Sequence, residues 1–187
     1  RVLIVGDPGA AIRLFRAVAR VWTWGSGCIS LPAHTRVFFM PQRPYLPHGS
    51  LRAALSYPAG PEKVPDDLAH GALTRVGLAH LLVRLDESDH WDEVLALPEQ
   101  QRLGFARLLI RRPDWIFVEH ATDALDTEGE EDMLHLLDVE FPRATLLTIG
   151  SHAGLAAHHR RKVVLERSGD TVRVHDENLA PVADRVA

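Results

Sequence analysis

Four short apolar runs constrain the fold of this chain more than any other feature. They are Val2–Val5, Val37–Met40, Trp115–Val118 and Thr145–Ile149, and each is followed by a glycine, a proline or a charged residue. Unbroken runs of this length are typical of strands buried on both faces of a parallel sheet. Because helical patterns separate them, we expect an α/β fold with a mostly parallel, doubly wound sheet. Ligands of such sheets bind at the carboxyl ends of the strands.

The stretch 42–112 has a different character, because prolines divide it into short helical patterns. These patterns cover Leu51–Ser56, Asp66–Val76 and Ala79–Arg84, and a longer one covers Glu99–Ile110. We therefore expect a helical lobe at 42–112, inserted into a core that consists of 1–41 and 113–187.

The remaining patterns complete the expected core. Gly6 to Gly9 predict a turn, followed by a helix over Ala10–Val21. Helices are also expected over about 128–140 and 154–159. Val163–Glu166 and Thr171–Val174 indicate a terminal hairpin.

Composition excludes several classes of function. The 187 residues carry a formal net charge of −4, which gives no reason to expect nucleic acid as a partner. No apolar run approaches the ~18 to 20 residues that span a bilayer. The single cysteine, Cys28, excludes an internal disulfide framework and fits a reducing compartment.

The chain opens inside a strand without a Met, so we expect a fragment or an excised domain whose N-terminal part is missing.

Two segments carry a resemblance to a known family. They read PQRPYLPHGSLRAAL from Pro41 and LALPEQQRLGFARLLIRRPDWIFVEHATDALD from Leu95. Together with the strand, glycine turn and helix at the start, they resemble the nucleotide-binding (ATPase) domain of ABC transporters. Within that family, the chain is most similar to the fused permease–ATPase group of peroxisomal fatty-acyl and bacterial peptide or cobalamin transporters. The resemblance covers Val2 to about Val174.

The resemblance implies a fold, cofactors and partners. The fold is a P-loop NTPase core with an inserted helical lobe, and the cofactors are ATP and Mg²⁺. The partners are a membrane permease domain, fused upstream or separate, and a second ATPase domain, identical or related, in a head-to-tail dimer. The location is the cytoplasmic face of a membrane, the inner membrane if the protein is bacterial.

The family's phosphate-binding loop corresponds to nine residues. They are Gly6, Asp7, Pro8, Gly9, Ala10, Ala11, Ile12, Arg13 and Leu14. Such a loop needs glycines, a lysine on the phosphates and a hydroxyl on Mg²⁺. Ala11 replaces the third glycine, Ile12 the lysine and Arg13 the hydroxyl residue. A hydrogen bond to a charged group contributes ~1.5 to 3 kcal/mol, so the lost lysine alone weakens binding by one to two decades.

Four residues occupy the family's catalytic positions, and two of them are also its metal positions. Gln42 matches the glutamine that reaches Mg²⁺ and the attacking water, and Glu119 replaces the Mg²⁺-binding aspartate. His120 replaces the glutamate that polarises the water, and Ser151 replaces the switch histidine. His152 follows one position later and compensates only if the loop slips by one residue.

The family's signature motif corresponds to Ala96, Leu97, Pro98, Glu99 and Gln100. In the family this motif presents a serine and two glycines to the γ-phosphate bound by the opposing subunit. Ala96 replaces the serine, and Leu97 and Pro98 replace the glycines. The D-loop Asp123–Asp126 is retained, except that Asp123 replaces a serine.

Three interpretations stay open at this point: a transport motor of low activity, a non-hydrolysing structural or regulatory dimerisation module, and a decaying gene copy. The histidines favour a surface or loop role over a metal site, because His120, His152 and the pair His158–His159 lack metal-ligand spacing. The four tryptophans are expected to pack in the core or lobe.

Overall fold

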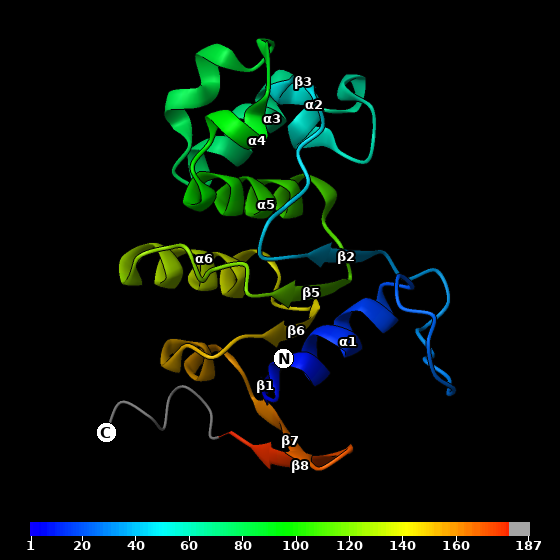
Figure 1. Cartoon of the computed structure of the whole chain (residues 1–187). Coiled ribbons are helices and arrows are strands. Elements are labelled where there is room, and N and C mark those ends of the chain that lie inside the picture. The colour runs from blue at the N-terminus through cyan, green and yellow to red at the C-terminus, as the bar shows by residue number, and fades with distance from the viewer. Residues whose placement is uncertain (180–187) are drawn as a thin grey trace. The chain divides into compact units, whose positions relative to one another are not determined.

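The computed structural model describes residues 1–179 of the chain (Figure 1). They form two compact units. The first contains 1–41, 113–123 and 142–179, and the second contains 42–112 and 124–141. Helix α6 (Thr127–Glu140) thus groups with the helical unit, where Arg75 and Arg112 form ion pairs with Glu140. The expected division of the chain at 42 and 112 stays a prediction.

The first unit is built on a six-stranded sheet in the order β2-β5-β6-β1-β7-β8. The strands are β1 (Val2–Gly6), β2 (Val37–Met40), β5 (Trp115–Glu119), β6 (Thr145–Ile149), β7 (Arg161–Ser168) and β8 (Thr171–Asn178). All neighbours pair in parallel except β7 and β8, which form an antiparallel hairpin. The fold is therefore α/β with a mostly parallel sheet, as the apolar runs predict.

Helix α1 (Pro8–Val18) packs on this sheet through Ala11 and Phe15. The ring of Phe15 meets Phe39 edge-on, with centroids 5.6 Å apart, and Phe39 stacks on Phe117 at 5.0 Å. Apolar and aromatic contacts therefore hold α1 in place.

Three expected boundaries in the first unit are wrong. Helix α1 occupies Pro8–Val18 instead of Ala10–Val21, because Pro8 presets the first helical turn and Arg20 adopts a left-handed φ of 62° just past the end. The terminal hairpin is longer than expected at both strands, since charged pairs such as Arg161 with Asp176 extend the ladder beyond its apolar part. The segment expected as a helix at 154–159 is a 3₁₀ helix, η3 (Ala153–His158).

The second unit consists of short helices around α5 (Leu97–Arg111). Its other elements are β3 (Gly49–Ser50), α2 (Leu51–Ser56), η1 (Pro61–Lys63), α3 (Asp66–Arg75), η2 (Ala79–Arg84), β4 (Ser88–Asp89), α4 (Trp91–Val94) and α6. Residues on almost every side of α5 are buried from Gln100 to Leu109. Strands β3 and β4 pair antiparallel, and the sequence did not predict them because each has only two residues.

The tryptophans do not all pack as expected. Trp91 is fully buried, but Trp24 is 82% exposed in the glycine-rich loop after α1. The expectation is therefore wrong for Trp24. In the described part of the chain, no helix combines the length and the apolar character that a bilayer span requires.

Candidate functional site

The expected phosphate-binding loop begins at Gly6, where the backbone leaves β1. Gly6 has a φ of +104°, and a Cβ at this position would lie 2.1 Å from the carbonyl oxygen of Leu165. The next amide, of Asp7, donates to that same oxygen (2.7 Å). Only glycine fits this close approach of two backbones.

Asp7 caps the helix that follows. Its Oδ1 accepts a hydrogen bond from the amide of Ala10 (2.6 Å), and its carbonyl accepts one from the amide of Ala11 (3.1 Å). Arg167 on β7 donates to both carboxylate oxygens, at 2.8 and 2.9 Å. These bonds from Arg167, and then the bond from Ala10, lower the pKa of Asp7 to about 2. A carboxylate of this chain therefore occupies the amide of Ala10, one of the amides with which a helix N-terminus binds an anion.

The rest of the predicted loop is helical, which corrects the expected turn over Gly6 to Gly9. Pro8 and Gly9 already belong to α1, and Pro8 has no N–H to offer. Ile12 carries no donor, and the guanidinium of Arg13 lies 3.6 Å from the point that a Cβ on Gly9 would occupy. The residues present therefore do not fit a triphosphate: the carboxylate of Asp7 takes the amide of Ala10, Pro8 has no N–H, and Ile12 stands where the lysine belongs.

Glu119 and His120 follow one another at the end of β5. Burial raises the pKa of Glu119, and the charge of Asp123 acts in the same direction, while His120 and Arg16 oppose it. Glu119 keeps a carboxylate at the family's Mg²⁺ position, one methylene longer than the aspartate, and its role as a metal ligand stays a prediction.

His120 adopts a left-handed φ of 50°, which is uncommon for a residue other than glycine. Its Nδ1 donates to Oδ2 of Asp123 (2.8 Å). Nε2 of His152 lies 3.9 Å from the other oxygen of Asp123, whereas Ser151 is exposed. The structure thus brings together two residues that replace family residues, His120 and Asp123. The sequence analysis noted each of them but did not pair them.

Gln42 and the signature segment belong to the second unit. The side chain of Gln42 is exposed, but its carbonyl accepts a hydrogen bond from Nε2 of Gln101 (2.9 Å). Oε1 of the buried Gln101 accepts from the amide of Ala124 (3.1 Å). Gln101 therefore ties two loops of this unit together, a role that the sequence analysis missed. Because Gln42 and Glu119 lie in different units, a shared metal site stays a prediction.

The signature residues form the start of α5. Ala96 is the N-cap residue, and Leu97 and Pro98 begin the first turn. Oε2 of Glu99 accepts a hydrogen bond from the amide of Ala96 (3.0 Å), and His80 donates to Oε1 (3.0 Å). This helix start, too, uses a carboxylate of its own chain.

Gln100, the next residue of α5, is buried. Its Nε2 donates to the carbonyls of Asp92 (2.9 Å) and Leu95 (2.8 Å). Gln100 therefore fixes the chain that enters α5, which is a structural role. Its assignment as a ligand-binding residue stays a prediction.

Comparison with known proteins finds relatives among ABC transporter ATP-binding proteins. No protein-family model matches the chain. The chain is 36% identical, over 90% of its length, to an uncharacterized ABC transporter ATP-binding protein of Haemophilus influenzae. It is 31% identical over 90% of its length to the rat ATP-binding cassette sub-family D member 3, and 30% identical over 82% to the Escherichia coli inner membrane ABC transporter ATP-binding protein YddA. The chain spans only 27–28% of the length of these curated relatives.

A solved structure shares the fold. It is that of a bacterial Atm1-family ABC exporter with ATP bound, which the chain matches with a TM-score of 0.74 over 98% of its own length and 34% of the exporter chain. The identity is 19%, so this similarity concerns the fold alone.

Proposed function

We propose, from the premise that this chain belongs to the family of ABC transporter ATP-binding domains, that its hydrolysis of ATP is impaired and that it acts through contact. In this proposal the chain is a pseudo-ATPase domain. Its fold supports a permease and a partner domain, while the chemistry of ATP is left to other chains.

The start of α1 carries the proposal. The amide of Ala10 binds the carboxylate of Asp7, and Arg167 holds that carboxylate in place. ATP binding here would have to displace a carboxylate that is itself paired with an arginine. The gain would be small, because Ile12 offers no positive charge to the phosphates.

The proposed partners are those of the family. A membrane permease domain and a second ATPase domain, in a head-to-tail dimer, would place the chain at the cytoplasmic face of a membrane. Two observations support this. The name of the Escherichia coli relative states an inner membrane ABC transporter, and the D-loop is held in place where Gln101 binds the amide of Ala124.

A calorimetric titration of the purified chain with ATP, with and without Mg²⁺, tests the proposal. We expect no heat of binding up to millimolar ATP in either case. Micromolar, Mg²⁺-dependent binding would contradict it, because it would require Gln42 and Glu119 to assemble a working site.

One observation favours a second candidate, a slow transport motor. The hydrogen bond from His120 to Asp123 is the arrangement of a general base oriented by a carboxylate. The motor interpretation requires a steady-state ATPase rate that falls at least about 100-fold in His120→Ala. A rate at background level for both the unchanged chain and this variant leaves the pseudo-ATPase proposal.

A further inference from the structure

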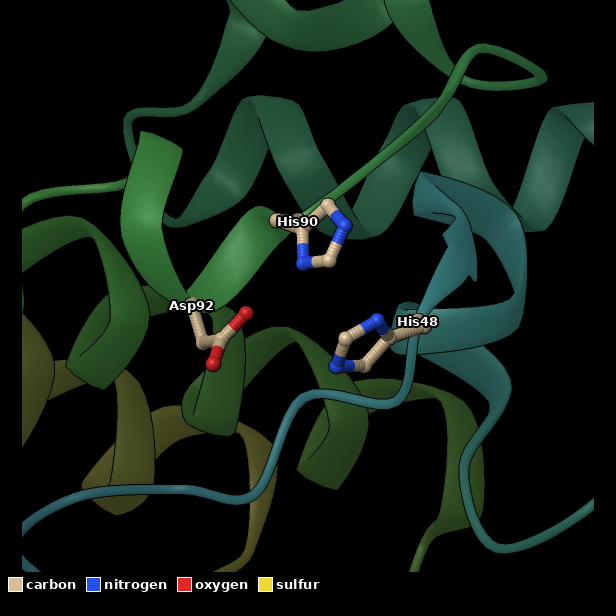
Figure 2. Close-up of side chains that lie close together, drawn as sticks. All are labelled: His48, His90 and Asp92. Carbon is tan, nitrogen blue, oxygen red and sulfur yellow. The ribbon is translucent and has the colours of Figure 1, made fainter.

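Two histidines and an aspartate of the second unit lie close together on its surface. They are His48, His90 and Asp92, and Figure 2 shows their side chains around one small space. One ligand atom from each residue lies within 4.8 Å of the others. The two imidazole rings meet edge-on, with centroids 4.2 Å apart.

The pairing of β3 with β4 places the two histidines. Gly49 pairs with Asp89 and Ser50 with Ser88, so continuing this antiparallel register by one residue sets His48 opposite His90. Directly opposite residues project from the same face of a strand pair, with their Cβ atoms about 4.5 to 5.5 Å apart. The register therefore accounts for the contact between rings that are far apart in the sequence.

Trp91 fixes the backbone between His90 and Asp92. Its side chain is fully buried, and its Nε1 donates to the carbonyl of Gly49 (3.0 Å). The guanidinium of Arg84 lies over its ring, 4.6 Å from the centroid. Because Trp91 is buried and hydrogen-bonded, it holds in place the backbone that carries the exposed side chains of His90 and Asp92.

The geometry points to a binding site for a divalent transition-metal ion, of which zinc is the expected one, formed by His48, His90 and Asp92. Two neutral imidazoles and one carboxylate are a donor set typical of zinc, with the fourth position left to water or to a partner's ligand. Ligand atoms around a tetrahedral zinc ion lie roughly 3.3 Å apart, since the bonds are about 2.0 Å long. Closing the observed separations to that value needs only small rotations of exposed side chains.

The site is independent of the phosphate loop and of the proposed loss of ATPase activity. None of its residues takes part in the hydrogen bonds of Asp7, His120 or Gln101 described above. The imidazoles make Mg²⁺ an unsuitable occupant, because Mg²⁺ prefers oxygen ligands.

Calorimetric titration of the tag-free, chelator-treated chain with zinc alone tests the site. We expect one zinc ion per chain, a rise in the midpoint of thermal unfolding, and no response to Mg²⁺. Cobalt(II) in place of zinc should give the visible absorption of a tetrahedral ion. Each of His48→Gln, His90→Gln and Asp92→Asn should weaken zinc binding at least about tenfold, the loss seen even for outer partners of metal ligands.

Two control variants make the result specific. His70→Gln removes an exposed histidine on α3, and Cys28→Ser removes the exposed thiol. Both should keep the stoichiometry and affinity of the unchanged chain. Far-UV circular dichroism checks that the cluster variants fold, which is expected because their side chains are exposed and His90 forms no side-chain cap on α4.

Two outcomes would overturn the site. One is the absence of stoichiometric zinc binding by the unchanged chain. The other is zinc binding that survives in His48→Gln and His90→Gln or that disappears in His70→Gln or Cys28→Ser, because it would locate the ion elsewhere.

Discussion

Helices α1 and α5 begin in the same way, although they belong to different units. Each has a proline in its first turn, Pro8 in α1 and Pro98 in α5. Each has a carboxylate that accepts an amide hydrogen bond at the helix start, Asp7 from Ala10 and Glu99 from Ala96. In the family these two helix starts face nucleotide. In this chain, a carboxylate of the chain itself binds one amide at each start.

The two helices differ in what holds them. Helix α1 rests on the sheet through the apolar residues Ala11 and Phe15, whereas α5 buries polar side chains in addition to its apolar ones. Gln100, Gln101 and Arg107 all donate to backbone carbonyls of that unit. The glutamines of α5 that match the family thus have structural roles. The residues that differ from the family, Ala96, Leu97 and Pro98, lie where the family contacts its ligand. This difference supports a retained scaffold without a nucleotide site.

Replacing Arg107 with Met tests whether the buried polar side chains of α5 stabilise the fold. Its expected effect, on the unfolding free energy, is the largest of those considered. The buried guanidinium donates to the carbonyls of Ala54 and Tyr45, both at 2.8 Å, and burial lowers its pKa to about 10, so it is charged at neutral pH. Leaving two buried carbonyls without donors costs about 3 kcal/mol of unfolding free energy. Urea denaturation measures this loss.

The exposed Arg43 provides a matched control. Arg43→Met should change the unfolding free energy by no more than about 0.5 kcal/mol. Equal effects of the two substitutions would contradict a structural role specific to α5.

Strand positions were the most predictable part of the fold. Val37–Met40 and Thr145–Ile149 are strands with the expected bounds, because each is a continuous apolar run that ends at a proline or a glycine. The two-residue strands β3 and β4 leave no such trace. The neighbourhood of His48 and His90 depends on their register, so no local pattern predicts it.

The candidate site was only partly predictable. The substitutions at Ala11, Ile12 and Pro98 are visible in the sequence, but the bond from His120 to Asp123 depends on the local fold at the end of β5. An aspartate followed by a proline is a helix-start signal, so Asp7-Pro8 already indicated an early start of α1. The glycines and the proline of this segment instead favoured a turn over Gly6 to Gly9, and the structure shows the cap.

Removing the capping carboxylate of α1 and adding a lysine tests directly whether this helix start prevents ATP binding. In Asp7→Ser combined with Ile12→Lys, the amides lose a competing charge and the phosphates gain a cation. ATP affinity should rise ten- to a hundredfold, the value of one to two hydrogen bonds to a charged group. In a calorimetric titration the variant should show heat of binding at ATP concentrations where the unchanged chain shows none.

A matched variant opens the start of α5 instead. Leu97→Gly combined with Pro98→Gly should leave ATP affinity unchanged, because the family's signature faces the nucleotide of the partner domain. Equal gains from both pairs of substitutions, or no gain from the α1 pair, would show that the two carboxylate-capped starts do not determine binding.

The pH dependence of Asp7 is the smallest expected effect, and it tests whether Arg167 holds the cap. The folded pKa of Asp7, about 2, lies below the value of about 3.9 for a free aspartate, so its charge stabilises the fold. That contribution is complete above about pH 4 and is lost as the pH falls towards 2. Asp7→Asn keeps a capping oxygen without the charge, so the difference in unfolding free energy between it and the unchanged chain should shrink over this window. Arg167→Gln should weaken the same pH dependence, and an unaltered profile in that variant would assign the low pKa to the amide of Ala10 instead.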